Sequence, residues 1–170
     1  MQSTIDFVQR VNEDVTKGEM TLRHFINVGA SSDSRDEELQ KVFQKLKTNF
    51  GKGSKDLTDE ELKRVFGPLE RNETEYTRIW NAVDALQFIA VGVRLGIYDI
   101  DVVARLYGAW YWHVAREFVP VIEYARSISR EERLFFYSEI QHVAADLLAG
   151  HERALGKAAP GSSRATESAS

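Results

Sequence analysis

Apolar residues along this chain recur mainly at spacings of three and four, which is the spacing of one face of an α-helix. Only three prolines interrupt the pattern, at positions 68, 120 and 160. Capping residues and glycines indicate where the helices begin and end, and Gly18 is expected to stop the first one. We therefore predict an all-α chain, with helices over residues 3–15, 21–28, 33–50, 58–67, 71–95, 100–120 and 129–148.

The helix predicted over residues 71–95 is apolar almost all round at its middle, because Ala85, Phe88 and Ile89 lie outside its main apolar face. A helix that is apolar on every side is typical of a protein interior. We expect it to be one of three long C-terminal helices that form a helical bundle. The shorter N-terminal helices are expected to cover this bundle.

The composition fits one domain, because 43% of the 170 residues are hydrophobic and such a chain can fold without disulfides or a structural metal. Lysines gather in the N-terminal part, and aromatic residues in the C-terminal part. The last residues are mainly Gly, Ala, Ser and Pro, which is typical of a disordered tail. We expect a single helical domain over 1–155, made of a lysine-bearing cover (1–67) and aromatic-rich core helices (68–155), with a disordered tail at 156–170.

The net charge of −4 argues against nucleic-acid binding, which needs a basic surface. The chain has no cysteine, which excludes disulfides, thiol nucleophiles and cysteine-ligated metals. Its longest uncharged apolar stretch, residues 106–115, is half of the roughly 20 residues that a transmembrane helix needs. The first residues resemble no secretory signal, so we expect a cytoplasmic protein. We expect no peripheral membrane contact through the helix at residues 5–15.

A polar stripe runs along the helix at residues 71–95. Two interpretations are open, because buried polar groups need partners. In the first, the stripe is an internal network in which Asp84 pairs with Arg105 or Arg116. In the second, it lines a pocket for a small polar ligand, although one carboxylate is too little for acid–base chemistry. The stripe consists of Thr77, Asn81, Asp84, Gln87 and Arg94.

Trp112 falls on the polar side of the following helix, together with Arg105 and Arg116. The small residues Ala104 and Gly108 lie near that side and would let another helix approach closely. One interpretation is that a second helix of the same chain covers Trp112. The other is a protein–protein interface, since tryptophan and arginine are enriched at the centres of interfaces.

The chain carries no signature of an enzyme and no metal motif. Glu139 and His142 form a single Glu-x-x-His pair, whereas di-iron bundles need two such pairs and further glutamates. Residues 50–61 can be aligned with a calcium-binding loop, but Phe50 and Lys52 stand at ligand positions and cannot bind calcium. We therefore expect no catalytic residue, no metal and no cofactor.

A run of lysines without intervening acids is the one stretch that could contact phosphates or an acidic partner. A solvated helix face and loop is the simpler interpretation, because the chain as a whole is acidic. Nucleic acid is therefore not expected as a partner. The run consists of Lys41, Lys45, Lys47, Lys52 and Lys55.

The junction at residues 88–99, which reads FIAVGVRLGIYD, is followed by Asp101-Val102-Val103 and by an aromatic-rich helix that ends in IEYAR at residues 122–126. These segments resemble a bacterial all-helical family catalogued only as a domain of unknown function, the 4760 family. The resemblance covers about residues 20–148 and supports an all-helical fold without implying an activity.

Two departures limit what the resemblance implies. Members often carry an N-terminal transmembrane segment, and the first residues of this sequence are not one, so a membrane setting is not carried over. The family usually has Asn and Glu where this chain has Asp84 and Gln87, so no site is carried over either.

We conclude from the sequence that the chain is a non-enzymatic protein–protein interaction module of a bacterium, or of a mobile element or phage. Its partner would be another protein or a second copy in a homodimer. The expected interface residues are Trp112, Arg105 and Arg116. The alternative function is a small polar ligand-binding or enzymatic pocket around Asp84 and Arg94, with Gln87 as a further lining residue.

Overall fold

A computed structural model describes residues 2–33, 35–53, 56–128 and 137–156. The elements in these ranges are helical, with no strand among them, which confirms the predicted all-α bundle. The helices are α1 (Gln2–Ser31), α2 (Glu37–Asn49), α3 (Asp59–Phe66), the 3-10 helix η1 (Gly67–Arg71), α4 (Glu73–Arg94), α5 (Ile100–Glu117), α6 (Val119–Ile128) and α7 (Ser138–Ala154).

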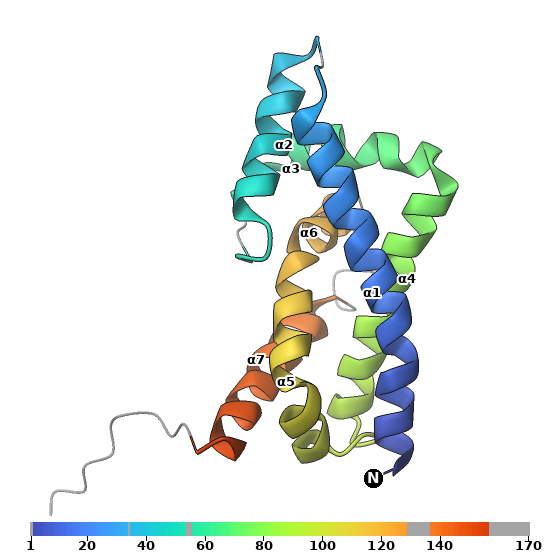
Figure 1. Cartoon of the computed structure of the whole chain (residues 1–170), viewed down its shortest axis with the longest axis vertical. Helices are drawn as coiled ribbons and strands as arrows, with labels where there is room; N and C mark the ends of the chain where they lie inside the picture. The colour runs from blue at the N-terminus through green and yellow to red at the C-terminus, as the bar shows by residue number, and fades with distance from the viewer. Residues whose placement is uncertain (1, 34, 54–55, 129–136, 157–170) are drawn as a thin grey trace, which may run out of the picture.

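Four long helices form the body of the molecule. Helix α1 packs along α4, and α5 packs along α7, while α4 also contacts α7 and α1 contacts α5. Helices α2, α3 and α6 lie toward the other end of α1, away from the N-terminus (Figure 1). Tyr111 of α5 is fully buried between these layers, and its hydroxyl donates a hydrogen bond of 2.8 Å to the carbonyl of Leu86 in α4. Burial therefore raises the pKa of Tyr111.

Helix α1 is one helix of 30 residues, so the predicted pair of short N-terminal helices is wrong. Gly18 does not stop the helix, because it is the point at which α1 meets α4. A Cβ atom at Gly18 would lie 2.7 Å from the carbonyl oxygen of Arg78 and would overlap the Cβ of Ala82. The glycine is needed for this close approach, and tertiary packing offsets its weak helix propensity.

The predicted loop at residues 29–32 is mostly helical as well, since α1 continues to Ser31. The last carbonyls of a helix need partners from outside it. Here α2 supplies them: Gln44 donates a 2.6 Å hydrogen bond to the carbonyl of Ala30, and Gln40 donates one of 3.2 Å to that of Ser32. Contacts with α2 therefore determine where α1 ends, and the local sequence of α1 does not predict these contacts.

The boundaries of α3, α4 and α5 lie within three residues of the predicted ones, whereas α2 begins four residues later and α7 ends six residues later than predicted. Thr58 caps α3 in a capping box with Glu61, as its sequence motif predicts. The break expected near Pro120 is present, and Pro120 occupies the first turn of α6, where a missing N–H is tolerated. The predicted start of the last helix at residue 129 and residues 157–170 of the predicted tail lie outside the described residues.

Small residues bring α5 and α7 together, as expected from their place in the sequence. A Cβ atom at Gly108 would overlap the carbonyl oxygen of Leu147 and lie 2.9 Å from the Cβ of His151. Gly150 of α7 makes a similar approach to Ala104. The two backbones are thus in direct contact at this crossing.

A chain of aromatic rings joins the N-terminal helices to the rest of the molecule. The ring of Phe25 in α1 lies 5.5 Å from that of Phe43 in α2 and 6.0 Å from that of Phe66 in α3. Phe66 in turn lies 5.6 Å from Tyr124 in α6. Residues of both halves of the sequence therefore share one buried cluster.

Candidate functional site

The outer face of α4 is exposed, which corrects the prediction that this helix is buried on every side. Residues 84, 88, 91 and 95 recur at spacings of three and four and therefore share this face. Phe88 is 66% exposed and Leu95 is 70% exposed, and Val91 between them is partly exposed. The N-terminal half of the same face is polar, with Asp84 exposed.

The turn after α4 extends this apolar face. The amide N–H groups of Ile97 and Tyr98 donate hydrogen bonds of 2.8 and 3.1 Å to the carbonyl of Gly92, so the chain folds back over the end of α4. Ile97 is 66% exposed. The ring of Tyr98 stacks on Phe7 of α1 at 4.7 Å. We call the exposed set Phe88, Val91, Leu95 and Ile97 the apolar α4 surface.

An open depression of about 420 Å³ borders this surface where α1 meets the turn. It is lined by Asp6, Phe7, Arg10, Ile97 and Tyr98.

A pocket along the predicted polar stripe stays a prediction. Asp84 and Arg94 are both exposed and stand ten residues apart on one helix, about 15 Å along its axis. The Nε of Arg94 lies 3.0 Å from the Oε2 of Glu139 in α7. Gln87 is buried. Asp84, Gln87 and Arg94 do not line the depressions at residues 37–49, 45–57 with 116 and 120, or 6–10 with 97 and 98.

The structure brings together two of the three predicted interface residues. The guanidinium carbon of Arg116 lies 4.2 Å from the centre of the Trp112 ring, and Arg116 Nη2 donates to the carbonyl of Lys52 in the α2–α3 loop. Trp112 is partly buried against the core. Arg105 is exposed and lies two helical turns from Trp112, about 10 Å along the axis. An interface at these residues stays a prediction.

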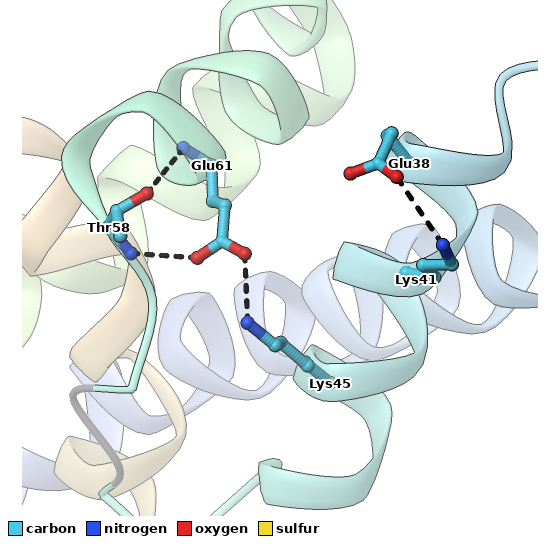
Figure 2. Close-up of polar contacts among 5 residues, drawn as sticks. All are labelled: Glu38, Lys41, Lys45, Thr58 and Glu61. Carbon is cyan, nitrogen blue, oxygen red and sulfur yellow. Dashed lines mark hydrogen bonds and ion pairs between the residues drawn. The ribbon is translucent and has the colours of Figure 1, made fainter.

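Two lysines of α2 have acidic partners, one on the same helix and one on α3. Lys45 Nζ lies 2.9 Å from Glu61 Oε1 in α3, and Lys41 Nζ lies 3.3 Å from Glu38 Oε1, as Figure 2 shows. The hydrogen bonds from Lys45 and from the backbone of Thr58 lower the pKa of Glu61. Two of the five lysines in the basic run therefore have acidic partners within the folded chain. Lys55 lies outside the described residues.

Three charged side chains that the sequence did not single out meet where α1 passes the end of α5. Arg23 Nη2 lies 2.8 Å from Glu117 Oε1 and 2.9 Å from Glu19 Oε1. Burial, followed by the hydrogen bond and charge of Glu19, raises the pKa of Glu117 to about 7, against the opposing effect of Arg23. No local signal points to this group, because Arg23 and Glu117 are 94 residues apart.

Metal-binding and membrane-spanning features were sought over the same residues. In the described part of the chain, no three His, Cys, Asp or Glu side chains are grouped so that they could hold a metal ion. Glu139, half of the predicted Glu-x-x-His pair, instead contacts Arg94. No described helix is long and apolar enough to cross a membrane.

Comparison with known proteins gives one match. A protein-family model described as "Domain of unknown function (DUF4760)" matches residues 2–146. No curated protein and no solved structure matches the chain.

Proposed function

From the premise that the chain belongs to the DUF4760 family, described only as a domain of unknown function, we propose a function on the basis of its surface. We propose that it is a non-enzymatic interaction module of a bacterium or its mobile elements. It binds a protein through the apolar α4 surface, and the partner that we propose is a second copy of the chain.

The observation that carries this proposal is the exposure of Phe88, Leu95 and Ile97 next to one another at one end of the bundle. Single exposed apolar residues are ordinary, but a contiguous group of large ones marks an interaction surface. Burying a phenylalanine or leucine side chain contributes roughly 1.5–3 kcal/mol. A partner that covers this group would therefore gain several kcal/mol.

The arrangement of this surface along one helix and the turn after it supports a second copy as the partner. Two-fold symmetry pairs one surface with itself in reversed direction. An antiparallel pair of α4 helices would bring the apolar α4 surface of one copy onto that of the other.

We expect Phe88→Gln to abolish self-association. The measurement is light scattering on a sizing column over a range of protein concentrations. The wild-type chain should shift from monomer to dimer as concentration rises, whereas Phe88→Gln should stay monomeric. Glutamine is a good helix former, so the change removes apolar surface and keeps helix propensity.

The matched control is Met20→Gln on α1, because Met20 is also 66% exposed and also lies within a helix. It should dimerise like the wild type. A wild-type chain that stays monomeric at every concentration would rule out the second copy as partner. If Phe88→Gln still dimerises, the dimer interface must lie on another surface.

Trp112, Arg105 and Arg116 are a second proposed contact surface, supported by the exposure of Arg105 and the partial exposure of Trp112. If they contribute, Trp112→Ala weakens the dimer in the same assay. Folding should be followed by circular dichroism, since Trp112 also packs against the core. A variant with wild-type folding and wild-type dimerisation would eliminate this surface.

A further inference from the structure

Two carboxylates share one cation at the joint between α1 and α5. Glu19 and Arg23 are one turn apart on α1, and Glu117 is the last residue of α5. With both acids ionised the group of three has a net charge of −1, and with one proton bound it is neutral. Because like charges in close contact disfavour double ionisation, such a pair retains a proton to a higher pH than a single carboxyl does.

The position of Glu117 makes the ionised form more costly. Its side chain is only 14% exposed, whereas that of Arg23 is 51% exposed. Glu117 Oε2 is buried and has no hydrogen-bond partner among the described residues. A buried carboxylate oxygen without a donor is unfavourable, while a protonated carboxyl can donate to the neighbouring Glu19.

The loop between α2 and α3 rests on this group. The Arg23 guanidinium carbon lies 4.8 Å from the centre of the Phe50 ring. A Cβ atom at Gly51 would be in van der Waals contact with Glu117 Cγ, at 3.6 Å. The preceding residue of α5, Arg116, donates a hydrogen bond to the carbonyl of Lys52. Residues 50–53 therefore contact α1 and α5 through the residues of the cluster and its direct neighbour.

We propose that Glu117 retains a proton beside Glu19, and that release of this proton loosens the contact of residues 50–53 with α1 and α5. When the proton leaves, the two carboxylates repel each other and compete for Arg23. Arg23 is also the residue that holds Phe50. The group therefore converts a change of pH into a change in how firmly the loop is held.

The other charged residues near Glu117 come from three elements. On α5, His113 is exposed one turn earlier, and Arg116 turns to Trp112 and Lys52. In the loop, Lys52 is exposed. On α6, the first charged residue is Glu123, which pairs with Arg126 at 2.7 Å. The electrostatic balance at Glu117 is thus set by Glu19, which favours the proton, and Arg23, which opposes it.

The sign of the effect follows from the raised pKa of Glu117. Between pH 4.5, the ordinary pKa of a glutamate carboxyl, and about pH 7, Glu117 is protonated in the native state and ionised in the unfolded chain. Native stability therefore falls as pH rises through this interval. The contribution of this proton to the free energy of unfolding is complete below about pH 4.5 and absent above about pH 7.

The test is an NMR titration of the full chain from about pH 5 to pH 8.5, with carbon-13 detection of the glutamate carboxyls. The Glu117 carboxyl should titrate with a midpoint near 7. The Cα–Hα cross-peaks of Gly51 and Gly53 should shift with the same midpoint, whereas those of Gly67, which has no neighbour within 4 Å of its Cβ position, should not.

In Glu117→Gln the shifts of Gly51 and Gly53 should be lost, because the amide cannot ionise. Glu123→Gln is the matched control and should leave them unchanged, since Glu123 belongs to another ion pair. A titration midpoint of Glu117 below about pH 5 would contradict the proposal that Glu117 retains a proton. Glycine signals that do not follow Glu117 would overturn the link to the loop, and the wild-type titration alone decides both points if the variant does not fold.

Discussion

Phe66→Ala is expected to lower the free energy of unfolding by about 3–5 kcal/mol, the usual cost of deleting a fully buried aromatic ring. Phe66 is 1% exposed and contacts the rings of Phe25 in α1 and Tyr124 in α6. The truncation would leave a cavity at the point where the N-terminal and C-terminal parts meet. Urea unfolding followed by circular dichroism measures the change.

Phe88→Ala is the matched control, because the same atoms are removed from a side chain that is 66% exposed. Its cost should be less than about 0.5 kcal/mol in a monomer at low concentration. Equal costs for the two variants would contradict the burial of Phe66.

The same experiment tests whether residues 1–155 unfold as one domain. All three tryptophans, Trp80, Trp110 and Trp112, lie in the part predicted as the core, so their fluorescence reports that part alone. Coincident fluorescence and circular dichroism transitions would support one cooperative unit. Separate transitions would make residues 1–67 an independent unit and contradict the proposed single domain.

Gly108→Ala is expected to destabilise the chain by about 1–3 kcal/mol, because the added methyl group would meet the backbone of Leu147 at the α5–α7 crossing. Alanine gains about 1 kcal/mol of helix propensity over glycine, but the two backbones must separate to admit it. Thermal unfolding should therefore show a lower melting temperature than the wild type.

Gly67→Ala provides the comparison, since nothing lies within 4 Å of its Cβ position and its backbone has helical angles. This change should leave the melting temperature unchanged or raise it. If Gly108→Ala were as stable as Gly67→Ala, α7 would have to pack farther from α5 than the structure places it.

Periodicity predicts most of the helices because the apolar face of each helix is a local property of the chain. The helix at residues 71–95 is observed as Glu73–Arg94, and the motif at Thr58 begins α3 as expected. Gly18 is the instructive failure. A glycine has the same helix propensity whether it lies within a helix or at its end. The packing of Gly18 against the distant Ala82 decides that Gly18 lies within α1.

The candidate surfaces were less predictable for the same reason. Phe88 is apolar, so its sequence context indicates burial, and only the placement of α1 and α7 shows that no helix covers it among the described residues. Asp84 and Arg94 share a helix, and both are exposed in the folded chain. Glu19 and Glu117 meet only in the folded chain, and no spacing in the sequence relates them.

The close contact of Gly18 with Ala82 also bears on how the protein is made. Helix α1 leaves the ribosome before α4, and the residue against which Gly18 packs is translated 64 positions later, which takes about 3–13 s at 5–20 residues per second. Until then Val8, Val15, Leu22 and Ile26, all buried in the finished protein, have no α4 to cover them. The nascent chain therefore passes through an interval in which the apolar face of α1 has no α4 to pack against, and translation speed between α1 and α4 sets the length of that interval.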